Sequence, residues 1–259
     1  MPTQNDIPSN IKIAIVTGGS RGLGRNTVVS LARRGVPSIF TYLSNRVEAD
    51  HAVAAVREAG ANAVALQLDT GRVGTFDVFV QSVRDALATL GADRFDYLVN
   101  NAGTSHHNAF ERTTEEELDG LYNVHFKGVF FLTQKLLPLL KDGGRIVNIS
   151  SGLTRFALAG SSSYASMKGA VEVLTRYLAK ELSGRGITVN TVAPGAIATD
   201  FSGGMVRDNP EVNKRVTEMT ALGRVGVADD IGPMIAALLS DDNRWVNAQR
   251  IEVSGGMVL

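Results

Sequence analysis

Short, largely apolar runs alternate with amphipathic stretches along most of this 259-residue chain. Runs such as 11–17 (IKIAIVT) and 187–192 (ITVNTV) are rich in β-branched residues, which is typical of strands in a buried parallel sheet. The stretches between the runs repeat apolar residues at helical spacing, and glycines such as Gly35 and Gly60 follow them as stop signals. The pattern therefore predicts strands and helices in regular alternation.

The strands are predicted at 11–17, 36–42, 63–68, 95–99, 145–150, 187–192 and 249–253. The helices are predicted from the turn at 18–24 to residue 34 and at 46–59, 74–90, 114–140, 162–183 and 229–239. Each crossover between parallel strands buries a helix against the sheet. The expected fold class is therefore α/β: a single-domain Rossmann fold with a doubly wound, parallel seven-stranded sheet, in the order 3-2-1-4-5-6-7, and helices on both faces.

One segment breaks the alternation. No linker or shift in composition divides the chain, so residues 11–259 are predicted to form one domain after a polar tail at residues 1–10. Residues 201–226 are polar, are interrupted by Gly and Pro, and follow the sixth strand at the carboxyl-end rim of the sheet. Such insertions often cover a site, so this segment is predicted to be a substrate lid.

Composition excludes several classes of function. The 26 basic and 26 acidic residues balance, which argues against a nucleic-acid partner or a polybasic membrane anchor. There is no Cys for disulfides or thiolate metal sites, and nothing else suggests a metal. Residues 1–10 lack the features of a signal peptide, and no apolar run approaches the ~18 residues of a spanning helix. A cytoplasmic protein without membrane contact is expected.

The turn at 17–24 (TGGSRGLG) joins the first strand to the first helix. Its small residues let the backbone approach a pyrophosphate, and the helix N-terminus supplies free N–H groups and a positive dipole end. The spacing is GxxxGxG rather than GxGxxG. Its position after the first strand and before a helix nevertheless indicates a dinucleotide site.

The end of the second strand distinguishes the two nicotinamide cofactors. An acidic residue there binds the ribose 2′-OH of NAD, whereas basic residues receive the 2′-phosphate of NADP. This chain reads YLSNR at 42–46, with no acidic residue before Glu48. Arg21 and Arg46, with the Ser44 hydroxyl, are therefore predicted to bind a 2′-phosphate, which favours NADPH/NADP⁺ over NADH/NAD⁺. The alternative is that both arginines are solvated.

A Tyr and a Lys four residues apart carry the candidate chemistry. Tyr164 and Lys168 share one face of the predicted helix 162–183, and an ammonium beside a phenol favours the phenolate. Ser151 follows the fifth strand, at the sheet edge where ligands bind in open α/β folds. The three side chains predict proton exchange with an alcohol or a carbonyl.

Together these motifs resemble the short-chain dehydrogenase/reductase family, nearest to its 3-oxoacyl-carrier-protein reductase-like branch. The matching features are TGGSRGLG, Asp69 after the third strand, NNAG at 100–103, the Ser/Tyr/Lys set, and Pro194-Gly195 with Thr199. They occur in order along nearly the whole chain, each at the end of the strand where the family has it.

The resemblance implies a role for each motif. Tyr164 would be the general acid/base, Lys168 would lower its pKa and bind the nicotinamide ribose, and Ser151 would stabilise charge on the substrate oxygen. Hydride would come from the nicotinamide. The implied cofactor-binding residues are Gly18, Ser20, Arg21, Gly22, Leu23, Tyr42, Ser44, Arg46, Asp69, Thr70, Asn101, Ala102, Gly103, Tyr164, Lys168, Pro194, Gly195, Ile197 and Thr199.

The chain departs from the family at one position. Where the family has an Asn that supports a proton relay to the Lys, residues 124–130 read VHFKGVF and place His125. Asn123 lies roughly 200° away around a helix and cannot substitute. A neutral imidazole has one donor and one acceptor, so His125 is predicted to support the relay; the alternative is a packed histidine. His106 and His107, near the expected substrate mouth, are interpreted as loop residues.

The expected function is NADPH-dependent interconversion of a ketone or aldehyde and an alcohol. Two alternatives remain: an NAD-dependent alcohol dehydrogenase, and a catalytically silent nucleotide-binding protein, which His125 favours and the Ser/Tyr/Lys set opposes. A homotetramer or homodimer is expected from the resemblance, and the apolar faces of 114–140 and 162–183 and the apolar ending 255–259 fit assembly. Apolar residues at 153, 156 and 158 indicate a partly hydrophobic substrate.

Overall fold

The predicted strands form one parallel sheet in the predicted order, β3-β2-β1-β4-β5-β6-β7. The computed structural model describes residues 11–259. The strands are β1 Ala14–Val16, β2 Ser38–Tyr42, β3 Ala63–Gln67, β4 Phe95–Asn100, β5 Leu140–Ile149, β6 Thr188–Pro194 and β7 Arg250–Val253. Every neighbouring pair is parallel. The predicted Rossmann architecture is therefore confirmed.

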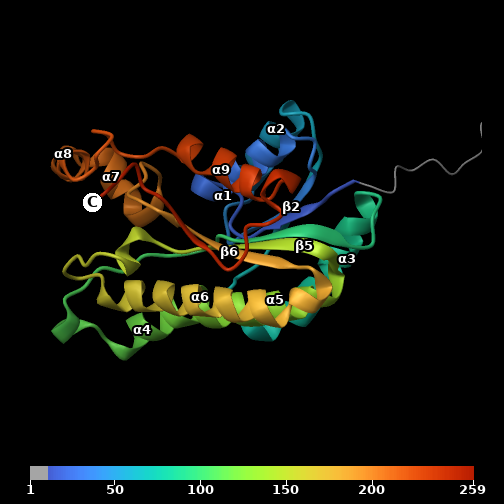
Figure 1. Ribbon diagram of the computed structural model, residues 1–259, viewed down its shortest axis with the longest axis horizontal. Helices are drawn as coiled ribbons and strands as arrows, with labels where there is room; N and C mark the ends of the chain where they lie inside the picture. Colours follow the sequence, from blue (N-terminus) through green and yellow to red (C-terminus); the bar gives the residue numbers. More distant parts are fainter. Residues whose placement is uncertain (1–10) are drawn as a thin grey trace, which may run out of the picture.

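Helices cover both faces of the sheet, as Figure 1 shows. The α-helices are α1 Gly22–Ala32, α2 Arg46–Glu58, α3 Phe76–Thr89, α4 Glu115–Tyr122, α5 Gly128–Leu136, α6 Ser162–Glu181, α7 Met205–Asp208, α8 Pro210–Glu218 and α9 Gly232–Leu238. Short 3₁₀ helices lie at Val73–Thr75, Phe110–Arg112, Leu137–Leu139, Gly152–Thr154, Ser183–Arg185, Phe201–Gly204, Ala228–Asp230 and Asp241–Asn243. Helices α1, α2 and α9 lie on one face, and α4, α5 and α6 on the other.

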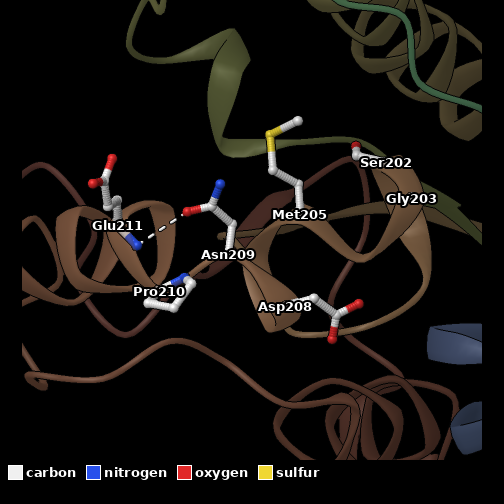
Figure 2. Close-up of a pocket in the computed structure, with 7 residues that line it drawn as sticks. All are labelled: Ser202, Gly203, Met205, Asp208, Asn209, Pro210 and Glu211. Atoms are coloured by element: carbon white, nitrogen blue, oxygen red, sulfur yellow. Dashed lines mark hydrogen bonds between the residues drawn. The ribbon is translucent and has the colours of Figure 1, made fainter.

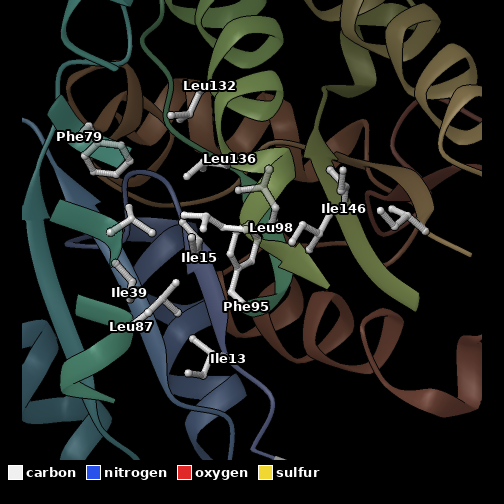
Figure 3. Close-up of a cluster of buried hydrophobic side chains, with 14 of the residues drawn as sticks. Ile13, Ile15, Ile39, Phe79, Leu87, Phe95, Leu98, Leu132, Leu136 and Ile146 are labelled. Atoms are coloured by element: carbon white, nitrogen blue, oxygen red, sulfur yellow. The ribbon is translucent and has the colours of Figure 1, made fainter. Parts of the chain in front are cut away.

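The sheet separates two apolar cores, which explains why the strands read as nearly continuous apolar runs. Side chains alternate along a strand, so Ile13 and Ile15 enter one core while Ala14 and Val16 enter the other. Figure 3 shows the first core, where strand side chains meet those of α3 and α5, such as Leu136. The burial of both sheet faces leaves the strand ends as the place for polar side chains.

The helix predicted as one run over 114–140 is interrupted. It consists of α4, a π-helical segment at Asn123–Lys127, and α5; the chain turns at Leu137–Leu139, and Leu140 already belongs to β5. The predicted start of this helix is confirmed, because Thr114 and Glu117 form a capping box. Helix α5 ends before the predicted residue 140 because Pro138 has no backbone N–H with which to continue the helix.

The segment 201–226 follows β6 and contains the short helices α7 and α8. These helices lie together near the C-terminus in Figure 1. Its start is unusual, because Ser202, Gly203 and Gly204 in succession have left-handed backbone conformations. Its role as a lid stays a prediction.

Within residues 11–259, no helix is both long enough and apolar enough to span a membrane. The cytoplasmic location stays a prediction from the sequence.

Candidate active site

The glycine turn between β1 and α1 has a backbone that only glycine accommodates. Gly18 has a φ of +66°, and a Cβ on Gly24 would lie 2.1 Å from the Gly18 carbonyl oxygen. Helix α1 has no acidic residue in its first turn and no side-chain cap at Arg21. Its first N–H groups are therefore free to bind an anion, and the positive end of its dipole points the same way.

The NNAG segment after β4 is fastened to this turn. The Thr17 hydroxyl accepts hydrogen bonds from the backbone N–H groups of Asn101 and Ala102, each at 2.9 Å. The Asn101 side chain donates to the carbonyls of Thr17 and Gly18, at 2.8 and 3.1 Å. Asn101 therefore shapes the cofactor turn in addition to lying along it. Thr17 is a contributor that the sequence analysis missed.

The predicted 2′-phosphate residues occupy the loops after β1 and β2. Backbone hydrogen bonding from Gly19 to the Thr41 carbonyl, at 2.8 Å, ties these two loops together. Arg21 and Ser44 are exposed there, and Arg21 forms no ion pair within the described chain. Arg46 is also exposed, but its Nε donates to Asp50 at 2.8 Å. The loops thus hold one unengaged guanidinium and one that is shared with a carboxylate.

The other predicted cofactor residues line the ends of β3 and β6. Asp69 accepts a hydrogen bond from the Gly71 N–H at 2.9 Å. After β6, Gly195 donates to the Val253 carbonyl at 3.1 Å, and Thr199 lies against Gly22 of the glycine turn. The free N–H groups, the tight glycines and the cationic β2 edge fit a dinucleotide phosphate.

The structure brings Ser151, Tyr164 and Lys168 together at the carboxyl end of β5. The Ser151 hydroxyl lies beside the Tyr164 phenol and acts to lower the pKa of that phenol, and its oxygen accepts the Leu153 N–H at 3.2 Å. Lys168 lies one turn further along α6, with its Nζ 5.6 Å from the Tyr164 ring centre. Nζ donates to the Ile149 carbonyl at 2.8 Å. Both the hydroxyl and the ammonium thus have fixed orientations.

Burial governs the protonation of this set. It raises the pKa of Tyr164 above its ordinary value, and only the Ser151 hydrogen bond opposes the rise. Burial also lowers the pKa of Lys168 to about 7. The sequence argument expected Lys168 to lower the pKa of Tyr164. Desolvation of the phenol is the larger effect in this structure, and the role expected of Lys168 stays a prediction.

His125 lies in the π-helical segment and meets the edge of Tyr164, with the two ring centres 5.2 Å apart. Its Nε2 lies 2.7 Å from the Thr104 carbonyl oxygen and 3.2 Å from the Thr104 backbone nitrogen, and its buried Nδ1 has no partner in residues 11–259. Burial, and then the charge of Lys168, lower its pKa to about 3. A Cβ on Gly103 would lie 2.8 Å from this ring. His125 is thus a neutral side chain that connects the NNAG segment to the active site.

The substrate mouth lies between the loop after β4 and the start of the 201–226 segment. Phe201 stacks 6.2 Å from the Tyr164 ring, and the Ser202 hydroxyl donates to Ser105 at 2.9 Å. His106 pairs with Glu117 at 2.8 Å, in keeping with a loop role, and the described chain contains no cluster of ligands for a metal.

Two hollows adjoin this mouth. One, of about 370 Å³, is lined by Ala109, Phe110, Leu153, Ala157, Leu158, Ala159, Gly160, Ser161, Ser162 and Ala165. The other, of about 640 Å³, is formed by the 201–226 segment itself, and Figure 2 shows its lining, including Met205 and the Asn209 side chain that caps α8. The first hollow lies beside the catalytic set, between Leu153 and Ala165.

Three polar residues behind Ser151 were not predicted. Glu172, Thr154 and Arg250 form a hydrogen-bonded cluster next to the serine. The sequence contains one signal for it, because Glu172 follows Lys168 by four residues on the same helix face. Arg250 lies too far along the chain for any local pattern to connect it.

Comparisons with known proteins agree with this site. Residues 18–258 match the family model described as enoyl-(acyl carrier protein) reductase. An uncharacterised oxidoreductase of Methylorubrum extorquens is 37% identical over 246 residues, which cover 95% of this chain and 97% of that protein. A promiscuous reductase that catalyses keto-reduction at C1 during lugdunomycin biosynthesis has a TM-score of 0.89 and 39% identity, covering 96% of this chain and 98% of the other. An angucycline C-6 ketoreductase with bound NADP has a TM-score of 0.90 and 35% identity, covering 95% of each chain.

The lowered pKa of His125 predicts how its stability contribution depends on pH. The unfolded chain binds a proton at this histidine below its ordinary pKa of 6.5, whereas the folded chain does so only near about 3. The contribution is therefore complete above pH ~6.5 and is lost as the pH falls towards 3. Between pH 7.5 and 5.0 the wild type should lose about 2 kcal/mol more unfolding free energy than His125→Asn. Urea unfolding at both pH values measures this, and equal losses would contradict the buried neutral imidazole.

Proposed function

The chain belongs to the short-chain dehydrogenase/reductase family, and we propose that it is an NADPH-dependent oxidoreductase that interconverts a ketone or aldehyde and an alcohol. The observation that carries this proposal is the meeting of the Ser151 and Tyr164 hydroxyls beside the buried ammonium of Lys168. They meet at the carboxyl end of the sheet, next to the glycine turn that fits a dinucleotide.

Tyr164 acts as the proton donor in the direction of carbonyl reduction. Because burial raises its pKa, the phenol keeps its proton at neutral pH until a substrate oxygen accepts it. The Leu153 N–H occupies one lone pair of the Ser151 oxygen, so the serine proton is free to point to the same substrate oxygen. There it stabilises the negative charge that develops. A nicotinamide bound at this site would supply the hydride.

Lys168 completes the proton transfer. Its pKa of about 7 means that the ammonium and the amine are both accessible near neutral pH. Once Tyr164 has given up its proton, a charged Lys168 stabilises the phenolate that remains. His125 offers its free Nδ1 as an acceptor for a water molecule that returns a proton to this pair, while its Nε2 holds the Thr104 carbonyl.

The cofactor site favours NADPH. The exposed guanidinium of Arg21 has no carboxylate partner in the described residues, and no acidic residue ends β2. The angucycline C-6 ketoreductase, with bound NADP, supports this choice by similarity. Arg46, which Asp50 engages, contributes less to the 2′-phosphate than Arg21.

The substrate is a neutral carbonyl compound with an apolar body. None of the ten residues that line the 370 Å³ hollow beside Tyr164 carries a charge. Phe110, at its edge, is 84% exposed, and Phe201 covers the Tyr164 ring from the opposite segment. An apolar ring system would bury this surface, whereas a carboxylate would find no cation in the lining. The two related ketoreductases also support a ketone.

Cofactor preference can be measured by equilibrium titration of the purified protein with NADPH and NADH, followed by nicotinamide fluorescence. NADPH should bind more tightly, and Arg21→Ala should weaken NADPH binding roughly tenfold, because one charge-assisted hydrogen bond to phosphate is lost. NADH binding by the same variant should not change. Tighter binding of NADH by the wild type would favour an NAD-dependent alcohol dehydrogenase, and binding of neither would favour a silent protein.

Turnover tests the proposed chemistry. NADPH oxidation should be faster with 1-tetralone, an apolar cyclic ketone, than with acetoacetate, and Tyr164→Phe should lower kcat at least about 10²-fold through loss of the general acid. Val78→Ala, at an exposed position on α3, serves as the control. Unchanged kcat in Tyr164→Phe would refute the role of the tyrosine. Full turnover of His125→Ala from pH 5 to 9 would refute the proton relay.

The protein also assembles into a homodimer or homotetramer through α4, α5 and α6. Leu118, Tyr122 and Phe130 are exposed on α4 and α5, and Val173 and Tyr177 on α6, which lies beside them (Figure 1). Apolar side chains exposed on neighbouring helices are typical of a protein interface.

Sedimentation velocity should therefore show an oligomer, and Tyr177→Asp should shift it towards the monomer, because a buried carboxylate at the interface has no partner. Val78→Asp, at an exposed apolar position on α3, is the matched control and should sediment like the wild type. A monomeric wild type would contradict this proposal.

A further inference from the structure

A partly buried carboxylate lies directly behind Ser151. One oxygen of Glu172, on α6, accepts hydrogen bonds from the Ser150 hydroxyl at 2.7 Å, the Thr154 hydroxyl at 2.7 Å and the Arg250 Nε at 2.8 Å. These partners come from the end of β5, the turn after it, and β7. Four separate parts of the chain therefore meet at a single carboxylate oxygen.

The same cluster holds the backbone of Ser151. The Ser151 carbonyl accepts from the Thr154 hydroxyl at 2.9 Å and from Arg250 Nη2 at 3.3 Å. Thr154 has one hydroxyl proton for two acceptors, the Ser151 carbonyl and Glu172. Arg250 reaches both acceptors, so neither is left without a donor whichever way the Thr154 proton points.

The side chain of Ser151 is fixed from the other end of the same turn. Its oxygen caps the 3₁₀ turn at Gly152–Thr154 by accepting the Leu153 N–H. The turn that orients the catalytic hydroxyl therefore begins at Ser151 and ends at Thr154, and Thr154 is the residue that the Glu172 cluster holds in place. A displacement of the cluster would rotate this turn and with it the serine proton.

The cluster continues into the C-terminal segment. Arg250 Nη1 donates to Glu252 at 2.9 Å, and Glu252 also accepts from Arg155 Nε at 2.8 Å. Arg155 Nη1 in turn donates to the Val258 carbonyl at 2.7 Å, and the Val258 N–H donates to Met219, just after α8. The end of the chain and the end of α8 are thus connected to the backbone behind Ser151.

Partial burial makes these contacts strong enough to set a geometry. The Glu172 side chain is 13% exposed and that of Arg250 is 25% exposed, so water competes weakly for either charge. A comparison ion pair lies elsewhere: Arg145, in the middle of β5 and 9% exposed, pairs at 2.8 Å with Asp241, which is 71% exposed. That pair touches no residue of the catalytic set and provides the comparison.

We propose that Glu172, Arg250 and Thr154 are positioning residues that hold the Ser151 hydroxyl towards the substrate oxygen. They act through the backbone turn 151–154 and do not touch the substrate. The proposal rests on the carbonyl reduction proposed above, because it assigns the cluster to the serine of that reaction.

The test is a double-mutant cycle on kcat for 1-tetralone reduction. Glu172→Gln keeps the side-chain shape but removes its charge, and should lower kcat roughly tenfold with the KM for NADPH unchanged. In a Ser151→Ala background the same substitution should change kcat less than about twofold, because the serine is the route of its effect. Thr154→Val should lower kcat as Glu172→Gln does, whereas Thr154→Ser, which keeps the hydroxyl, should retain the kcat of the wild type.

A second readout does not require activity. Hydrogen exchange of the Leu153 amide reports its bond to the Ser151 oxygen, and Glu172→Gln should speed it roughly tenfold. Arg145→Gln is the control: it should destabilise the fold but leave both kcat and the Leu153 exchange unchanged. Additive effects of Glu172→Gln and Ser151→Ala, or unchanged Leu153 exchange in Glu172→Gln, would overturn the proposal.

The two proposals fail in different ways. If no carbonyl compound supports NADPH oxidation by the wild type, the proposed function fails. Hydrogen exchange of the Leu153 amide would still show whether the cluster positions the serine.

Discussion

The active site depends on a lysine ammonium that is almost completely enclosed by protein. Lys168 is 5% exposed, and its hydrogen bond is to the Ile149 carbonyl, the last residue of β5. Burial of an ammonium is costly, so its pKa falls to about 7. Its neighbours respond to that placement: burial and then the charge of Lys168 lower the pKa of His125, and the ammonium lies 5.6 Å from the centre of the Tyr164 ring. The chemistry therefore follows from where β5 ends.

A line of buried amides and hydroxyls keeps that strand end fixed to α6. The Asn100 side chain donates to Asn148 at 2.8 Å, Asn148 donates to Thr175 at 2.9 Å, and Thr191 donates to Thr175 at 2.8 Å. These residues belong to β4, β5, β6 and α6, and all are buried. Loss of one member leaves its neighbours unsatisfied, at about 1–3 kcal/mol each. The network therefore fixes the position of α6, which carries Tyr164 and Lys168.

The sequence predicts what local pattern and strand order determine. The strands, the sheet order and the site of the glycine turn follow from apolar runs and from residues such as Gly24, where no Cβ fits. The π-helical segment could not be predicted, because it depends on the tertiary contacts of His125 and on Gly128, whose Cβ would meet the Thr70 carbonyl at 2.1 Å. The direction of the Tyr164 pKa shift was also out of reach, since desolvation is a property of the folded surroundings and the YxxxK spacing carries no information about it.

The raised pKa of Tyr164 bears on the direction of the reaction. A phenol that keeps its proton is a competent donor to a carbonyl oxygen, whereas oxidation of an alcohol requires a phenolate as base. Burial opposes the phenolate, and the neighbouring Ser151 hydroxyl favours it. Carbonyl reduction can start from the protonated phenol, whereas alcohol oxidation requires Tyr164 to lose its proton first. In the proposed reaction the phenol therefore acts first as a proton donor, and the proposed role of Glu172 and Arg250 is to set, through the 151–154 turn, where the Ser151 proton points.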